Sequence, residues 1–154
     1  MKQRIGIAQA LINDPSLLIL DEPTAGLDPK ERIRFRNILS KLSRNRIIIL
    51  ATHIVSDVEY LADRVILLRE GKMIAEKKPA ELLEEIKENV WNLSVKKEEL
   101  ESYINTFAVS NAAFEEGAYR LHLVSKKQPS DEATLASPTL NDVYLSCFGE
   151  DERV

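Results

Sequence analysis

Three short aliphatic runs divide the first half of the chain, at residues 17–20, 47–50 and 65–68. Each run consists only of Leu, Ile or Val and lacks the polar alternation of a strand with one solvent-exposed face. Runs of this length are typical of strands buried on both faces of a parallel sheet. We therefore predict three strands, each covered on both faces.

The segment between the first two runs has the periodicity of a helix, because its apolar residues recur at i, i+3, i+4 and i+7. These residues are Phe35, Ile38, Leu39 and Leu42. Asp28 stands where an N-cap is expected, Pro29 suits the first helical position, and Glu31 stands where a capping box places an acid. The pattern predicts a strand, a helix and a second strand in succession, so this half of the chain is predicted to be α/β.

Further elements of the first half are predicted on both sides of the third run. A helix is expected to extend to Asn13 at the start of the chain, and another to cover 56–62. Glu70, Gly71 and Lys72 are typical of a hairpin turn. A short acidic helix is expected over 79–87.

The pattern changes near Asn89, where a small α+β appendage is predicted. It is expected to contain two alternating strands, a helix, a polar linker and a closing amphipathic helix. The corresponding ranges are 90–95 and 119–124, 100–107, 126–138 and 140–148. We therefore predict two domains, residues 1–88 and residues 89–154.

Composition and charge restrict the classes of function. The chain has 154 residues, 44% of them hydrophobic, and a formal charge of −4, which is a globular composition with no basic surface for nucleic acid. The apolar runs are far shorter than the roughly 18 to 20 residues of a membrane-spanning helix, so we expect no direct membrane insertion. The single cysteine, Cys147, cannot form an internal disulfide, which suits a reducing cytoplasm.

Two adjacent carboxylates, Asp21 and Glu22, directly follow the first predicted strand. Ligands of open α/β sheets gather at the carboxyl ends of strands. One carboxylate there can hold Mg²⁺ through its waters, and the next can orient and deprotonate an attacking water. Taken alone, the pair is more typical of a solvated acidic strand end than of a catalytic site.

Two further polar residues belong to the same predicted edge or to the loop beside it. His53 follows the second strand, and parallel pairing would bring it to the edge that carries Asp21 and Glu22. An imidazole there could donate a hydrogen bond to a terminal phosphate. Asp28 lies six residues after Glu22. Taken singly, His53 could be a solvated residue and Asp28 an N-cap.

These residues together resemble the ATPase subunits of ABC transporters. Residues 18–23, Leu-Ile-Leu-Asp-Glu-Pro, resemble the Walker B strand, and residues 25–28, Ala-Gly-Leu-Asp, resemble the D-loop. Thr52-His53 resembles the switch histidine, and the start of the chain to Asn13 resembles the segment after the signature Leu-Ser-Gly-Gly loop. The resemblance continues through the next strand and hairpin to about Glu85, and residues 137–145 are similar to the tail of exporter ATPases.

The resemblance implies both a fold and a set of roles. The fold would be part of a P-loop NTPase sheet with its helices, followed by the α+β appendage. Asp21 would serve Mg²⁺, Glu22 would be the general base, His53 would contact the γ-phosphate of ATP, and Asp28 would act across an ATPase dimer. The partners would be a membrane permease subunit and a second ATPase subunit. The chain would then be cytoplasmic and peripheral to the inner face of the cell membrane.

A Walker A loop, Gly-x-x-x-x-Gly-Lys-Ser/Thr, does not occur in this sequence. Its one Gly-Lys pair, Gly71-Lys72, is followed by Met73 and has Ile66 in place of the first glycine. The glutamine loop and the Leu-Ser-Gly-Gly loop are missing as well. We expect the chain to be the C-terminal part of a longer exporter ATPase, as a fragment or through an internal start at Met1. By itself it would be poorly stable, bind ATP weakly and be inactive.

Two other functions are compatible with the sequence. One is a short, non-hydrolysing form that docks on a full-length ATPase or permease as a regulatory or structural protein. The other is an ATPase of the soluble kind, as in ABC-type translation or DNA-repair factors. The appendage and the exporter-like tail argue against the second.

Overall fold

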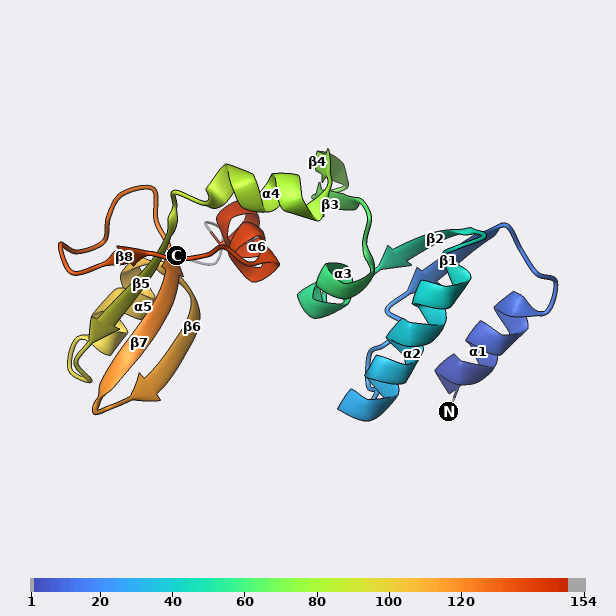
Figure 1. Cartoon of the computed structure of the whole chain (residues 1–154), viewed down its shortest axis with the longest axis horizontal. Coiled ribbons are helices and arrows are strands. Elements are labelled where there is room, and N and C mark those ends of the chain that lie inside the picture. The colour runs from blue at the N-terminus through green and yellow to red at the C-terminus, as the bar shows by residue number, and fades with distance from the viewer. Residues whose placement is uncertain (1, 150–154) are drawn as a thin grey trace. The chain divides into compact units, whose positions relative to one another are not determined.

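The computed structural model describes residues 2–149, which divide into two compact units at Ala62 and Asp63 (Figure 1). The boundary predicted between residues 88 and 89 stays a prediction.

The first unit is a parallel strand pair with three helices. Its elements are α1 (Lys2–Leu11), β1 (Leu17–Asp21), α2 (Pro29–Leu42), β2 (Ile47–Ala51) and α3 (Val55–Leu61). β1 and β2 pair in parallel from Leu17 opposite Ile47 to Asp21 opposite Ala51. The predicted strand, helix and strand are therefore confirmed, and the ends of the two strands coincide.

The helix α2 begins as its sequence predicts. Asp28 is the N-cap, its side chain accepts a hydrogen bond from the amide of Glu31 at 2.9 Å, and Pro29 is in the first turn. Phe35 and Leu39 of the predicted stripe are buried, whereas Ile38 is largely exposed. The helix thus contributes a narrower apolar face than the four-residue stripe suggested.

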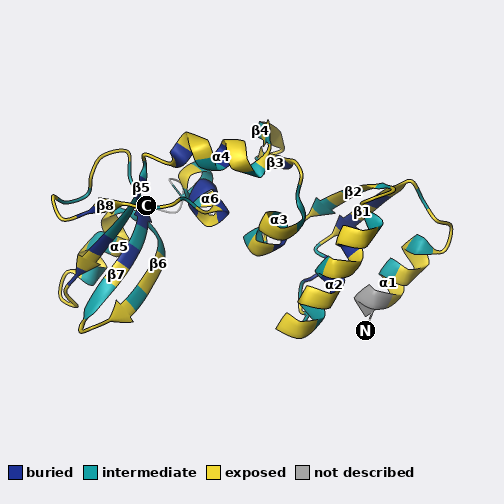
Figure 2. Ribbon diagram, viewed as in Figure 1, coloured by how far each residue is buried: buried dark blue, intermediate teal, exposed yellow. Residues whose placement is uncertain are grey.

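Only one face of the β1–β2 sheet is covered. Leu18 and Leu20 pack with Phe35 and Leu39 of α2, and side chains of α1 join the same cluster. The alternate residues of both strands point to the other face and remain between 46% and 67% exposed (Figure 2). These four residues, which we call the open aliphatic face, are Leu17, Ile19, Ile47 and Ile49.

The prediction that both faces are buried is therefore wrong for β1 and β2 within the described part of the chain. Successive side chains of a strand point to opposite faces, so one layer of helices can cover only every second residue. Among the described residues, β2 pairs only with β1, and β3 pairs only with β4. The edges of these two sheets are consequently unpaired within the described residues.

The second unit begins with the predicted hairpin of β3 (Val65–Arg69) and β4 (Lys72–Lys77). Its two turn residues, Glu70 and Gly71, have φ values of 50° and 75°. Positive φ at both central positions is the signature of the type I′ turn, whose twist matches that of antiparallel strands. The turn predicted from the sequence is confirmed.

The rest of the second unit is an antiparallel sheet of four strands with three helices. Its elements are α4 (Pro79–Ile86), β5 (Val90–Val95), α5 (Leu100–Thr106), β6 (Ala108–Glu115), β7 (Ala118–Val124), β8 (Thr134–Leu135) and α6 (Leu140–Phe148). The strand order is β6-β7-β5-β8. The core of the sheet contains Leu93, Val95, Leu121 and Leu123. An α+β arrangement was predicted, but β6 was not, and β8 lies inside the predicted linker.

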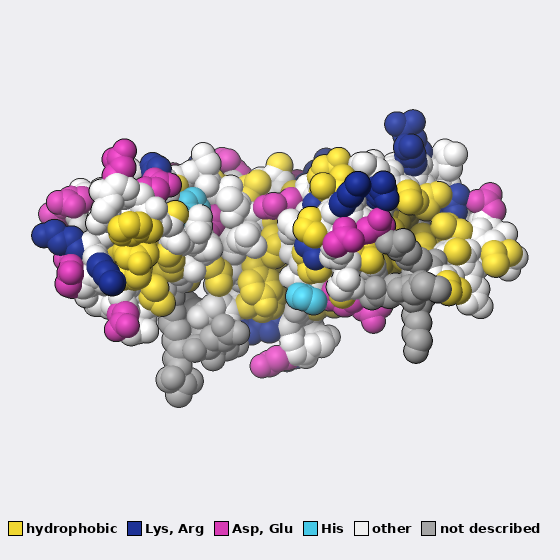
Figure 3. All heavy atoms as spheres, turned by 90° about the horizontal axis from the view of Figure 1, so that it is seen from below, with side chains coloured by type: hydrophobic (Ala, Val, Ile, Leu, Met, Phe, Trp, Pro, Cys, Tyr) yellow, Lys and Arg dark blue, Asp and Glu magenta, His cyan; other side chains and the backbone are white. Residues whose placement is uncertain are grey.

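The exposed surface mixes apolar and charged side chains, as Figure 3 shows for one face of the molecule. Between residues 2 and 149, no helix has the length and apolar character needed to cross a bilayer.

Candidate functional site

The carboxyl ends of β1 and β2 form the candidate site, which lies entirely within the first unit. Asp21 is the last residue of β1, and the amide of Glu22 donates to the carbonyl of Ala51 at 2.9 Å, which extends the pairing by one step. His53 follows two residues after Ala51. The predicted meeting of His53 with the acidic pair at one sheet edge is confirmed.

Glu22 has a left-handed backbone conformation, with φ of 43°. This region is uncommon for residues other than Gly and Asn, and such conformations cost on the order of 1 kcal/mol or more. The turn that starts here is closed by a hydrogen bond from the amide of Ala25 to the carbonyl of Glu22 at 3.2 Å. The chain therefore leaves the strand at Glu22, whose side chain reaches the residues after β2.

The carboxylate of Glu22 is held by residues that follow β2. Its Oε1 accepts a hydrogen bond from the amide of His53 at 2.8 Å and lies 2.7 Å from Nδ1 of the same residue. Its Oε2 accepts from Oγ1 of Thr52 at 3.3 Å. Oγ1 of Thr52 in turn accepts from the amide of Ile54 at 3.0 Å. A carboxylate with this many donors has a defined position before any ligand is bound.

These contacts also change the acidity of Glu22. Partial burial acts to raise its pKa, but the hydrogen bonds and the charge of His53, together with the hydroxyl of Thr52, lower the pKa below the ordinary glutamate value. Glu22 is therefore ionised at neutral pH.

Asp21 and Asp28 lie at different places relative to that pair. Asp21 is exposed at the end of β1, directly before Glu22. The carboxylate of Asp28 is engaged as the N-cap of α2, so the plain structural role considered for Asp28 is confirmed. The structure brings Glu22 and His53 into contact, places Asp21 beside them, and gives Asp28 a hydrogen bond in α2.

A buried polar network beside the site was not predicted from the sequence. Asp57 of α3 and Thr24 of the turn after β1 are both 0% exposed, and the hydroxyl of Thr24 donates to Oδ2 of Asp57. Nε of Arg36 on α2 donates to Oδ1 of Asp57 at 2.7 Å. All three are ordinary polar residues of a loop or a helix in the sequence, and no pattern there signals that they meet.

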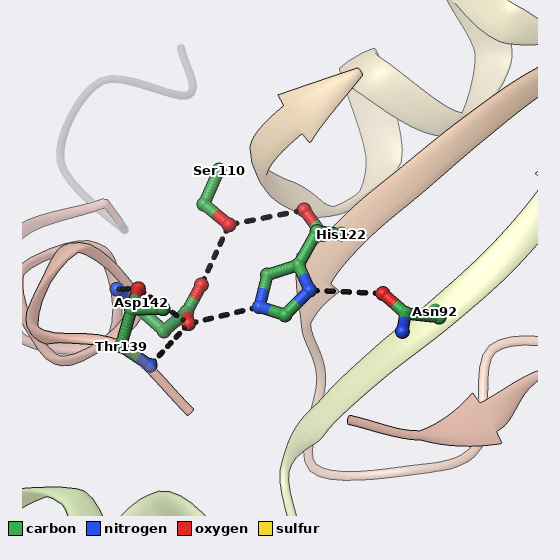
Figure 4. Close-up of polar contacts among 5 residues, drawn as sticks. All are labelled: Asn92, Ser110, His122, Thr139 and Asp142. Carbon is green, nitrogen blue, oxygen red and sulfur yellow. Dashed lines mark hydrogen bonds and ion pairs between the residues drawn. The ribbon is translucent and has the colours of Figure 1, made fainter. Parts of the chain in front are cut away.

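A second polar cluster, in the other unit, surrounds Asp142 near the start of α6 (Figure 4). Its Oδ2 accepts from the amide and the hydroxyl of Thr139, each at 2.8 Å, and lies 3.0 Å from Nε2 of His122. Its Oδ1 accepts from the hydroxyl of Ser110 at 2.6 Å. The other ring nitrogen of His122 lies 2.9 Å from Oδ1 of Asn92.

This cluster joins α6 to the sheet and is not arranged for nucleophilic chemistry. The hydroxyl of Ser110 lies against Oδ1 of Asp142 and the backbone carbonyl of His122, whereas the ring nitrogens of His122 contact Asp142 and Asn92. The sequence assigned His122 no role. The pattern Thr139-x-x-Asp142 is a capping-box signal that could have identified the acid, whereas nothing in the sequence points to His122. No group of three or more His, Cys, Asp or Glu that could hold a metal ion occurs in the described range 2–149.

Comparisons with known proteins agree with these features. Residues 1–25 match the family described as ABC transporter. The chain is 51% identical over 86 residues to the Nod factor export ATP-binding protein I of Rhizobium johnstonii, a match that covers 55% of this chain and 28% of that protein. The protein of the same name from Burkholderia orbicola is 45% identical over 85 residues, which is 54% of this chain and 28% of that protein. The chain thus spans less than a third of the length of these relatives.

A solved structure is also similar, namely a dimeric ATP-binding cassette in a post-hydrolysis state bound to ADP and Pi. The match has 32% sequence identity and a TM-score of 0.47, and it covers 50% of this chain and 34% of that one. The family match and the exporter relatives thus support a partial ATP-binding subunit of an ABC transporter.

Proposed function

We propose that the first unit supplies the carboxylate side of an ATP-hydrolysing site in an ABC exporter. Glu22 is the general base that takes a proton from the attacking water, and His53 contacts the γ-phosphate. Both are the catalytic residues of the proposal. A general base must be ionised at working pH and lie at a fixed distance from its water.

The contact between Glu22 and His53 is the observation that supports this proposal most strongly. A solvated acidic strand end would not require a histidine that approaches the same carboxylate oxygen with both its amide and its ring nitrogen, at 2.8 and 2.7 Å. The pair stands at the coincident carboxyl ends of two parallel strands, where ligands of α/β sheets bind.

Mg²⁺ and ATP are the cofactors of the proposed site. Asp21 would hold Mg²⁺, and an exposed carboxylate at a strand end fits that ion, since Mg²⁺ in nucleotide sites takes one or two protein carboxylates together with phosphate oxygens and water. The ion would neutralise charge on the phosphates.

The partners of the proposal are a membrane permease subunit and a second ATPase subunit. Asp28, exposed at the start of α2, would act across the interface of the two ATPase subunits as well as capping its helix. The names of the relatives, which refer to export, support outward transport. The protein would work in the cytoplasm, against the inner face of the cell membrane.

The proposal is tested in a chimera that joins an upstream segment carrying a Gly-x-x-x-x-Gly-Lys-Ser/Thr loop to residues 1–154. In this chimera Glu22→Gln should lower kcat by about 100-fold to 10,000-fold, because the general base is lost, and should leave ATP binding intact. The matched control is Glu98→Gln, a change at an exposed glutamate of the second unit. Turnover that is unchanged in Glu22→Gln would refute the role of Glu22.

A second candidate function is a short form that docks on a full-length ATPase or permease and does not hydrolyse ATP. The open aliphatic face favours it, since an exposed apolar face of a two-stranded sheet is typical of a surface that another chain covers. Binding of the unfused chain to such a partner, with no change in the rate of ATP hydrolysis, would support this second function over the first.

A further inference from the structure

We propose that Thr24, Asp57 and Arg36 form a positioning network that fixes Glu22 and His53 against each other. The inference rests on the proposed function in that it assigns these three residues to the same site. They would act on the catalytic residues through the backbone of the turn after β1 and of the segment that leads into α3.

The network connects the two loops of the site. Thr24 lies two residues after Glu22, and Asp57 lies four residues after His53. The bond from the Thr24 hydroxyl to Asp57 therefore joins the turn after β1 to the first turn of α3, in addition to the bonds between Glu22 and His53. Two segments joined at two points separate less readily than two segments joined only by the exposed contact between Glu22 and His53.

Backbone hydrogen bonds restrain the short segments that join Thr24 to Glu22 and Asp57 to His53. The carbonyl of Thr24 accepts from the amide of Leu27 at 3.1 Å, in the turn that begins at Glu22. The amide of Asp57 donates to the carbonyl of Ile54 at 2.9 Å, directly after His53. A displacement of Thr24 or Asp57 is therefore transmitted to the neighbouring site residue.

Arg36 anchors this network to α2. Besides its bonds to Asp57, its Nη2 donates to Oγ of Ser56 at 2.8 Å, and its guanidinium lies 5.7 Å from the ring centroid of Tyr60. A planar guanidinium that is bonded in two directions and stacked in a third has one orientation. Arg36 thus fixes the carboxylate that Thr24 binds.

The burial of Asp57 favours a positioning role over a purely stabilising one. An ion pair with a fully buried carboxylate gains little over apolar residues of the same volume, because desolvation offsets the attraction. The hydrophobic cluster of Leu18, Leu20, Phe35 and Leu39 already packs α2 on the sheet. What the polar network adds is a directional connection between the two loops.

The test measures hydrogen exchange at the amide of His53, which donates to Glu22, by NMR in the 154-residue chain. Thr24→Val keeps the shape of the side chain and removes its hydroxyl, whereas Thr24→Ser keeps the hydroxyl. In Thr24→Val the exchange rate at His53 should rise about fivefold to tenfold relative to the amides of β1 and β2, as expected for one weakened hydrogen bond. Thr24→Ser should restore the ratio.

A purely structural role gives a different result, because loss of stability raises the exchange rates of His53 and of the sheet amides together. An unchanged ratio in a folded Thr24→Val chain would overturn the proposal. Arg36→Gln serves as the second variant and decides the matter if Thr24→Val does not fold, with Arg34→Gln, which affects an exposed arginine of α2, as its control. The measurement needs no ATP turnover. The positioning network can therefore be refuted while Glu22 remains the general base, and the role of Glu22 can be refuted while the network stands.

Discussion

Nδ1 of His53 lies 2.7 Å from Oε1 of Glu22, and the amide of His53 donates to the same oxygen at 2.8 Å. The imidazole is 75% exposed and the carboxylate side chain 34% exposed. A pair this open to solvent owes its geometry to the two strand ends and to the backbone of Glu22, because exposed ion pairs alone contribute little.

The role of His53 can be examined by changing its ring alone. In the chimera, His53→Ala keeps the backbone bond to Glu22 and removes the imidazole, so kcat should fall by about 100-fold or more through loss of a donor to the phosphate. Steady-state kinetics with ATP give the comparison, and Glu98→Gln, at an exposed position of the second unit, is the control. Equal rates for His53→Ala and the unchanged chimera would contradict the assignment.

The chain by itself should bind ATP weakly or not at all. Most of the affinity for the phosphates in this class of site comes from a glycine-rich loop and its lysine, and the sequence contains no such loop. Isothermal titration calorimetry of the purified chain with Mg-ATP should detect no saturable binding in the micromolar range. Saturable micromolar binding would mean that other residues of the chain hold the phosphates.

The cap of α2 should contribute measurable stability. Asp28→Ala removes the acceptor of the Glu31 amide and should lower the free energy of unfolding by about 1 kcal/mol. Asp28→Asn retains an acceptor and should cost much less. Urea denaturation followed by circular dichroism distinguishes the two variants, and equal stabilities would show that the cap does not act as the contact indicates.

Asp142 should make the stability of the second unit depend on pH. Burial acts to raise its pKa, but hydrogen bonds from Ser110, Thr139 and His122 together lower the pKa below that of an ordinary aspartate. Because the folded-state pKa is the lower one, the stabilisation is fully present above the unfolded-state pKa. It is lost as the pH falls through the folded-state pKa.

Denaturation of the chain from pH 7 into the acid range measures this dependence. Asp142→Asn should reduce the loss of stability on acidification and cost about 1–3 kcal/mol at neutral pH, since it leaves buried donors without an ionised acceptor. Asp131→Asn, at an exposed loop position, is the control, and its free energy of unfolding should depend on pH as that of the unchanged chain does. The assignment fails if the free energy of unfolding of Asp142→Asn falls with decreasing pH as steeply as that of the unchanged chain.

The open aliphatic face should drive self-association of the isolated chain. Ile19 and Ile49 lie opposite each other in the β1–β2 register and are 66% and 50% exposed. Replacing both with Thr keeps the preference for strand structure and removes apolar surface, so sedimentation velocity should show less association. Leu135→Thr, at an exposed leucine of β8, should have little effect.

The local elements of the first unit could be predicted because each has a short-range signal. Asp28 and Pro29 mark the start of α2, and the aliphatic runs mark β1 and β2. The meeting of Glu22 and His53 followed from one topological fact, that parallel strands place their carboxyl ends at the same edge. Nothing beyond strand direction was needed to bring them together.

Other features depend on contacts that a sequence pattern does not encode. The strand β6, Ala108–Glu115, has small and polar residues without regular alternation and owes its conformation to pairing with β7. The bonds of Asp57 to Thr24 and Arg36 join residues that are 33 and 21 positions apart. Exposure of Ile19 was missed because a run of aliphatic residues indicates what a strand can bury rather than how many layers are present to cover it.

The open aliphatic face also bears on how long the protein would persist in a cell. Within the described residues, the β1–β2 sheet has unpaired edges and an exposed row of isoleucine and leucine side chains. These are features by which chaperones and proteases recognise unassembled chains. The steady-state amount of this chain would then be governed by the supply of whatever covers β1 and β2, more than by its own rate of synthesis.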